Sequence, residues 1–204
     1  MLDKYTDDFA PFNHLIEPRE TRSLIESSIN PQQLTAYQRA LLILDGTVTQ
    51  FIEAYSLESI HVVRLNQTRR VLQAPHAWLE AEADTEVLAR EVILQGHPSG
   101  TVYVHAVSLL VISRLPETLL AQFETDSGGI GRILLSSRIE NRRELLWFGH
   151  EQISEMPPQL VPHLNNDFLS RYYRVMISGT PVMLINEKFP RYLGYPPGSQ
   201  SCAP

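Results

Sequence analysis

Cysteine is almost absent from this sequence of 204 residues. The one cysteine, Cys202, lies close to the C-terminus, so no disulfide can form within the chain and a metal site built from several thiolates is excluded. The histidines are scattered, with no HxH or HxxxH spacing, and therefore do not indicate a metal site either. We expect no metal and no cofactor.

Long apolar runs and an excess of basic residues are also missing. No run approaches the length that spans a membrane, and the start, "MLDKYTDDFAPF", is acidic and lacks the apolar core of a signal peptide. The formal net charge is −6, whereas phosphate binding depends on clustered Lys and Arg. Of the basic pairs Arg69–Arg70 and Arg142–Arg143, the second is flanked by acids, and we interpret both pairs as solvated surface. These absences predict a cytoplasmic protein without nucleic-acid or membrane partners.

Apolar residues, by contrast, are plentiful. Their share of 43% in a chain of this length suits one domain with a substantial core. We predict an irregular N-terminal arm at residues 1–30, a single domain at residues 31–192 and a loose C-terminal tail at residues 193–204. The arm is interrupted by prolines, and the tail has too few apolar residues to pack.

Helical spacing appears in three segments. Pro31 opens "PQQLTAYQRALLILDG", in which apolar residues recur every three or four positions until a glycine ends the pattern. Thr47 is a candidate N-cap for a short helix over residues 48–56. A further helix is predicted over residues 115–125, with Ser113 as its candidate cap.

From Ile60 onward the apolar period changes from helical spacing to two. The six predicted strands are residues 60–72, 85–96, 100–113, 142–153, 170–179 and 181–189. "GHPSG" and "SGTP" have the composition of hairpin turns. Strands joined mainly by hairpins, with helices before and between them, predict the α+β class: an antiparallel sheet with helices packed on one face.

Two charges lie in apolar strands. Counting by twos, Arg90 shares a face with Leu88 and Val92, and Glu187 shares a face with Met183 and Ile185. We expect both side chains to point inward. A buried charge is costly unless it is paired, so each needs a partner.

Two interpretations of these charges remain open. In the first, Arg90 and Glu187 pair with each other or with backbone, or reach solvent at a strand end. In the second, they line a cavity, where Arg90 presents a forked donor to a ligand carboxylate and Glu187 acts on a hydroxyl or a transferring proton. The strand pattern alone does not decide between them.

Two further segments carry candidate residues. In "DSGGIGRILL", paired glycines precede an apolar run and can direct backbone N–H groups at an anion, although such a pair is more often only a turn. The segment is not a dinucleotide fingerprint, because it lacks the third glycine and the preceding strand. Tyr172 and Tyr173 alternate across a strand, and we interpret them as sheet packing.

Several of these blocks, in this order, resemble the chorismate lyases (chorismate pyruvate-lyases), which split chorismate into 4-hydroxybenzoate and pyruvate. "LAREVIL" resembles the family's strand with its substrate-binding arginine, at Arg90. "SRYYRVMISGTPVMLINEKFP" resembles the closing hairpin that leads to the essential glutamate, at Glu187. The resemblance runs from about Leu44 to Pro190.

Two shorter blocks extend the resemblance. "GGIGRILL" is similar to the family's segment ending in Leu-Gly-Arg, at Ile130, Gly131 and Arg132. "LDGTVTQFIEAY" resembles its helix-break segment and puts Val48 where the family commonly has methionine, followed by Thr49.

The resemblance implies a fold and a site. The fold is a six-stranded antiparallel sheet with helices on one side and a pocket sealed by helix-turn-helix flaps. In the site, Arg90 and the backbone amides of Val48 and Ile130 hold the ring carboxylate, and Glu187 acts as acid or base near the ring oxygen. Arg132, beside the glycine segment, is a candidate for the pyruvyl carboxylate.

The implied activity is that of a carbon–oxygen lyase that takes chorismate, releases 4-hydroxybenzoate for a pathway such as quinone biosynthesis, and is inhibited by this product. A monomer and a homodimer both remain open. The alternative function is a non-catalytic sensor domain of the same fold that binds a small acid. Such regulators carry a DNA-binding region of about sixty residues ahead of this fold, and the irregular arm is too short and too acidic for one.

Overall fold

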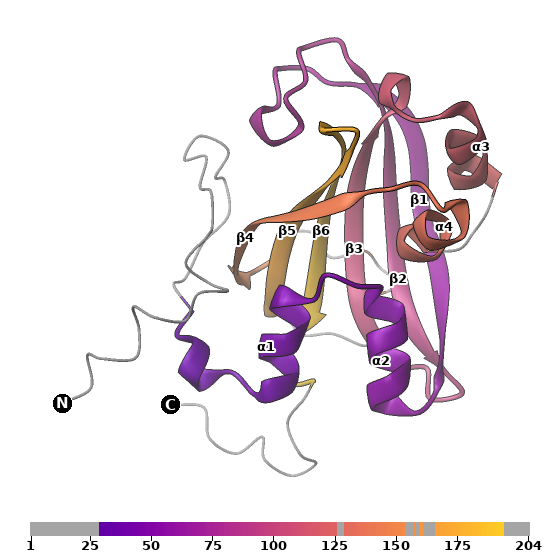
Figure 1. The fold of residues 1–204 in the computed structure, drawn as a ribbon. Coiled ribbons are helices and arrows are strands. Elements are labelled where there is room, and N and C mark those ends of the chain that lie inside the picture. The colour runs from indigo at the N-terminus through magenta and orange to yellow at the C-terminus, as the bar shows by residue number, and fades with distance from the viewer. Residues whose placement is uncertain (1–28, 126–128, 154–156, 158–159, 161–165, 194–204) are drawn as a thin grey trace.

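The computed structural model describes residues 29–125, 129–153, 157, 160 and 166–193. The predicted arm at residues 1–30 and tail at residues 193–204 therefore lie almost entirely outside the described residues. Between them, the described residues form helices and a single sheet (Figure 1).

Within the described residues, six strands form one antiparallel sheet. They are β1 (Ser59–Val71), β2 (Glu86–His97), β3 (Val102–Val111), β4 (Arg142–Glu151), β5 (Phe168–Ile177) and β6 (Thr180–Pro190). Their order across the sheet is β1-β2-β3-β6-β5-β4. One half of the sheet is thus β1, β2 and β3, and the other half is β4, β5 and β6, with consecutive strands as neighbours in each. The pairing of β3 with β6 joins the two halves. Each strand lies within two residues of its predicted segment, so the predicted sheet is confirmed.

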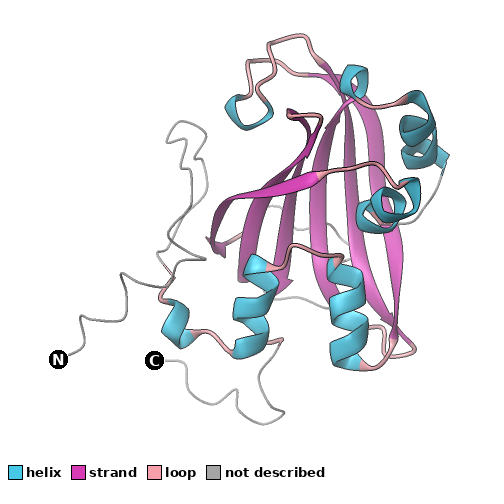
Figure 2. Ribbon diagram, viewed as in Figure 1, coloured by secondary structure: helices cyan, strands magenta, loops and turns pink. Residues whose placement is uncertain are grey.

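The four α-helices of the described segments cover one side of this sheet (Figure 2). They are α1 (Ala36–Ile43), α2 (Val48–Ser56), α3 (Glu117–Thr125) and α4 (Ile130–Ser137). This arrangement confirms the predicted α+β class. None of the described helices has the length and apolar character needed to cross a membrane.

The starts of two helices differ from the prediction. Helix α1 begins at Ala36, because the Thr35 hydroxyl accepts the N–H of Gln38 while the Gln38 side chain accepts the N–H of Thr35. This capping box was missed, and Pro31 opens only a short 3-10 turn. Ser113 does not cap α3 either, since it lies in a 3-10 turn that precedes the helix.

The helices divide the covered face of the sheet into two apolar clusters. The cluster under α1 and α2 includes Leu41, Leu42, Ile52, Leu94, Val104 and Phe189. The cluster under α3 and α4 includes Leu88, Leu110, Phe123, Leu134, Val175 and Met183. The pair α1 and α2 thus covers one end of this face, and the pair α3 and α4 covers the other. The middle of the sheet lies beneath the place where the two pairs meet.

Candidate active site

Strand register places Arg90 and Glu187 on the same face of the sheet. Arg90 pairs with Ser108, which pairs with Ile185 on the next strand. Glu187 lies two residues after Ile185 and pairs with Ala106. Directly paired residues, and residues two apart in a strand, share a face. Arg90 is 2% exposed and Glu187 is 5% exposed, so both point inward.

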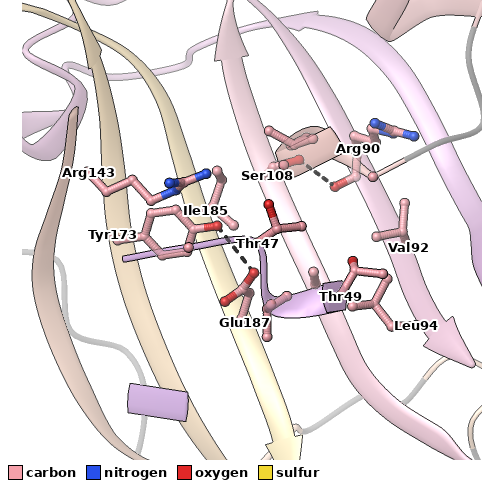
Figure 3. Close-up of a pocket in the computed structure, with 16 residues that line it drawn as sticks. Thr47, Thr49, Arg90, Val92, Leu94, Ser108, Arg143, Tyr173, Ile185 and Glu187 are labelled. Atoms are coloured by element: carbon pink, nitrogen blue, oxygen red, sulfur yellow. Dashed lines mark hydrogen bonds between the residues drawn. The ribbon is translucent and has the colours of Figure 1, made fainter. Parts of the chain in front are cut away.

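Both residues line one pocket between the sheet and the N-termini of α2 and α4. The lining is Gly46, Thr47, Val48, Thr49, Arg90, Val92, Leu94, Ala106, Ser108, Gly129, Ile130, Gly131, Arg143, Tyr173, Ile185 and Glu187. Figure 3 shows Arg90 and Glu187 on either side of Thr47. The structure therefore brings together all but one of the site residues named from the sequence.

Two helix N-termini add positive potential to this pocket. Val48 is the first residue of α2 and Ile130 is the first residue of α4. The first N–H groups of a helix have no acceptor within it, and the helix dipole places partial positive charge there. Together with the Arg90 guanidinium, these termini suit the binding of a carboxylate.

Glycine allows the two helix starts to approach each other. A Cβ atom on Gly131 would lie 3.0 Å from the Thr47 methyl carbon, which is tighter than ordinary van der Waals contact. Thr47 occupies the N-cap position of α2, as predicted, but its side chain makes no capping hydrogen bond. The glycine segment is therefore a packing element that brings α4 against the start of α2, directly over the pocket.

The partner of Glu187 is Arg171, a residue that the sequence analysis did not single out. Arg171 Nε and Nη2 lie 2.8 and 2.7 Å from Oε2 of Glu187. The Tyr173 hydroxyl donates to Oε1 at 3.2 Å. Arg171 Nη1 also donates to the carbonyl of Leu44 at 2.9 Å. The carboxylate thus keeps a fixed orientation inside the protein.

Tyr173 is a second pocket residue whose position was not predicted. Burial is the main cause that raises the pKa of Tyr173, the charge of Glu187 adds to it, and the charges of Arg171 and Arg143 act in the opposite direction. The phenol therefore stays protonated and serves as a hydrogen-bond donor to Glu187. Tyr173 also belongs to the apolar cluster under α3 and α4, so it packs in the sheet as interpreted and lines the pocket as well.

The interpretation of the pair Arg142–Arg143 as solvated surface was right for Arg142 and wrong for Arg143. The Arg142 side chain is 70% exposed, but that of Arg143 is 17% exposed and lines the pocket. Successive strand residues point to opposite faces, and one face of this sheet is covered by helices. The same count by twos along the strand that predicted an inward Arg90 could have predicted that Arg143 points inward.

Arg132 is the predicted site residue that the pocket does not include. It lines a neighbouring, more open cleft together with Glu53, His61 and Val62. Thr49, like Thr47 and Gly129, lines both hollows. Arg132 therefore lies beside the pocket and not with Arg90 and Glu187.

The chemistry of the pocket is that of anion binding and proton transfer. Its polar groups are guanidinium groups, one carboxylate, one phenol, hydroxyls and backbone N–H groups. Within the part of the chain that the structure describes, no group of three or more His, Cys, Asp or Glu could hold a metal ion. Such a pocket can orient an acidic molecule and move a proton with its own side chains.

Comparison with known sequences connects this pocket to one family. The family model for chorismate pyruvate-lyase, Rv2949c-like, matches residues 42–195, a range that contains every pocket residue. The chain is 30% identical to the chorismate pyruvate-lyase of Mycobacterium leprae (strain TN) over 159 residues, which cover 75% of this chain and 73% of that protein. It is 26% identical to the chorismate pyruvate-lyase of Mycobacterium tuberculosis (strain ATCC 25618 / H37Rv) over 180 residues, 82% of this chain and 88% of that protein.

Solved structures share the fold at much lower identity. The effector domain of PhnF from Mycobacterium smegmatis matches with a TM-score of 0.55 and 12% identity, over 71% of this chain and 88% of that chain. A putative GntR-family transcriptional regulator matches with a TM-score of 0.52 and 14% identity, over 67% of this chain and 59% of that chain. At such identities the likeness establishes the fold alone.

Proposed function

Because the chain belongs to the Rv2949c-like chorismate pyruvate-lyase family, we propose that it eliminates pyruvate from chorismate to give 4-hydroxybenzoate. The observation that carries the proposal is the pocket in which buried Arg90 and buried Glu187 share one sheet face beneath two helix N-termini. This carbon–oxygen lyase reaction forms an aromatic ring, so orientation and proton transfer suffice and no cofactor is required.

The ring carboxylate of chorismate binds at the positive end of the pocket. Arg90 donates two parallel hydrogen bonds to it, and the backbone N–H groups of Val48 and Ile130 at the two helix starts assist. Gly131 completes this backbone cradle. The ring then lies between the apolar side chains of Val92 and Ile185, which line the pocket. Its C4 carbon, opposite the carboxylate, faces Glu187.

Glu187 carries the proton transfer. Arg171 and Tyr173 direct three donor groups at its carboxylate and fix its orientation, and in the proposed reaction Glu187 first acts as a base. It takes the proton from C4, the C4–H electron pair forms the new ring double bond, and the C3–O bond breaks. The departing enolate of pyruvate then receives the proton at its methylene carbon, which regenerates the carboxylate.

The position of the pocket between the sheet and the two helix starts has a consequence for product release. A flat aromatic acid held by Arg90 and the helix N-termini is the reaction product as well as part of the substrate. The product therefore dissociates slowly and inhibits the enzyme, because these carboxylate contacts do not change when pyruvate leaves.

The activity is tested by incubating the purified protein with chorismate. We expect 4-hydroxybenzoate, followed by its absorbance and identified by chromatography, and pyruvate, measured with lactate dehydrogenase and NADH, in equal amounts. A boiled sample controls for spontaneous decay of chorismate. Formation of neither product above that control, or of an isomeric hydroxybenzoate, contradicts the proposal.

A second function is favoured by the fold that the chain shares with the effector domain of PhnF. In that function the same pocket binds a small acid without converting it. Titration calorimetry with chorismate separates the two functions, since a binding module gives a saturable heat and no 4-hydroxybenzoate, whereas the lyase forms product during the titration.

A further inference from the structure

We propose that Arg143 binds the carboxylate of the enolpyruvyl arm of the substrate, so that the pocket recognises a dianion with one guanidinium group for each acidic group. The inference rests on the proposed function, because it identifies how the second acidic group of chorismate is held.

The position of Arg143 supports this role. Arg143 pairs with Val175 across the sheet, and Leu145 pairs with Tyr173, so these residues share the helix-covered face. In Figure 3 the Arg143 guanidinium points toward Ile185 and the interior of the pocket. The side chain thus enters the pocket from β4, whereas Arg90 enters from β2 on the far side of the central strands.

Arg143 also makes weaker contacts than neighbouring arginines of the sheet. Arg171 contacts Glu187 at 2.7 Å, and Arg174 contacts acidic side chains at 2.7 Å. Arg143 contacts Asp45 only at 3.8 Å, with the Asp45 side chain 79% exposed, and its Nη1 donates to the Asp45 carbonyl at 3.4 Å. An ion pair of this kind contributes little to stability. Arg143 can therefore turn to a ligand anion at small cost.

The chemistry of the substrate requires such a group. Chorismate carries one carboxylate on its ring and one on the enolpyruvyl arm at C3, and burying either without a partner is costly. Arg90 takes the ring carboxylate, while Glu187 repels an anion and already neutralises Arg171. Arg132 faces the neighbouring cleft. Arg143 is the pocket cation left for the arm.

A second hollow lies on the other side of Arg143. It is lined by Leu42, Leu44, Asp45, Arg143, Leu145, Arg171 and Tyr173, among others. Arg143 and Tyr173 line both this hollow and the pocket. Pyruvate keeps the arm carboxylate after the C3–O bond breaks, so Arg143 can follow it toward this hollow while 4-hydroxybenzoate stays on Arg90.

Two stable aromatic probes test the role of Arg143 without turnover. The first, 3-(carboxymethoxy)-4-hydroxybenzoate, has an acidic arm, and the second, 3-methoxy-4-hydroxybenzoate, has a neutral one. Calorimetric Kd values are measured for the wild type and Arg143→Gln. We expect Arg143→Gln to weaken binding of the acidic probe by about tenfold to a hundredfold, the usual effect of losing a charged hydrogen bond, and to leave the neutral probe unchanged.

Arg142→Gln is the matched control. The Arg142 side chain is next to Arg143 in the sequence but faces solvent, so this variant should change neither Kd. If Arg143→Gln weakens both probes equally, or neither, the assignment is wrong. Arg143→Lys keeps the positive charge but loses the two-donor guanidinium group, so it should lose part of the preference for the acidic probe. This variant provides a readout if Arg143→Gln does not fold. The probes do not react, so this result is independent of the chorismate assay. If the protein converts chorismate but its preference for the acidic probe does not depend on Arg143, this assignment alone is refuted.

Discussion

At the scale of single residues, the pocket shows how a carboxylate is held inside an apolar strand face. Arg171 and Tyr173 together present three donor groups to Glu187, and Arg171 is itself anchored to the carbonyls of Leu42 and Leu44. Removing Arg171 alone would leave a buried, unpaired carboxylate, which is strongly destabilising. The ion pair therefore both permits the burial of Glu187 and fixes the direction in which it can take a proton.

Substituting the two charges of the pocket should separate binding from chemistry. Glu187→Gln keeps the shape and can still accept from Arg171, but it cannot take a proton, so we expect kcat to fall about a hundredfold to ten-thousandfold with KM near the wild-type value. Arg90→Gln should mainly raise KM, because it removes a contact to the ring carboxylate that is present before and during the reaction. Steady-state kinetics with chorismate measure both parameters.

Thermal unfolding of both variants serves as the control for their folding. If Glu187→Gln retains the wild-type kcat, the proton passes through another group, and if Arg90→Gln binds chorismate as the wild type does, the ring carboxylate lies elsewhere. Either result would remove that residue from the proposed mechanism without affecting the fold.

At the scale of secondary-structure elements, strands were easier to predict than the way helices meet. The two-residue period found all six strands and the inward direction of Arg90 and Glu187, because strand alternation is local. The partner of Glu187 on β5 depends on the pairing of strands distant in sequence, which the pattern does not contain. The close contact between Thr47 and Gly131 joins segments more than eighty residues apart, so "GGIG" alone could not distinguish a turn from a packing contact.

The contact between these helix starts predicts coupling between Gly131 and Thr47. In Gly131→Ala the new methyl group would lie 3.0 Å from the Thr47 methyl carbon, a close approach that opposes the gain in helix propensity of about 1 kcal/mol. Thr47→Ser removes that methyl group. Free energies of unfolding for the wild type, both single variants and the double variant form a cycle, in which we expect a coupling of about 0.5 kcal/mol or more, with Gly131→Ala better tolerated when Thr47→Ser is also present.

Additive effects in that cycle would mean that α4 and the start of α2 adjust independently. The helix pairs would then not be held together at this point, and the glycine segment would have no packing role. Affinity for 4-hydroxybenzoate measured on the same four proteins shows whether the coupling extends to the pocket, whose roof these helix starts form.

At the scale of the whole molecule, the sheet carries buried polar groups on both faces. Glu187 faces the pocket, while its neighbour Lys188 faces the other side and lies 3.2 Å from Glu151. On the same side His105 Nε2 lies 2.7 Å from Glu91. Lys188, Glu151 and His105 are all buried, so the central strands are enclosed on both faces. Stability should therefore respond to protonation on the face opposite the pocket.

Acid should destabilise the protein well above the pH at which carboxylates titrate. Burial lowers the pKa of His105 below its ordinary value of 6.5; the hydrogen bond to Glu91 and the charge of Glu151 oppose this shift, and the charge of Lys188 adds to it. Burial also lowers the pKa of His76 and of His150. As the pH falls from 7.5 to 5.5 the unfolded chain takes up protons before the folded protein does, so the free energy of unfolding decreases, by up to about 1.4 kcal/mol per pH unit for His105.

Urea unfolding at pH 7.5, 6.5 and 5.5 measures this dependence. His105→Gln can still donate to Glu91 but does not titrate, so we expect a smaller decrease in unfolding free energy between pH 7.5 and 5.5 than in the wild type. The sign follows from the lowered pKa, since a histidine stabilised in its charged form would make the protein more stable as the pH falls. A wild-type free energy that stays level or rises toward pH 5.5, or an equal decrease in His105→Gln, would show that His105 becomes charged inside the sheet without cost.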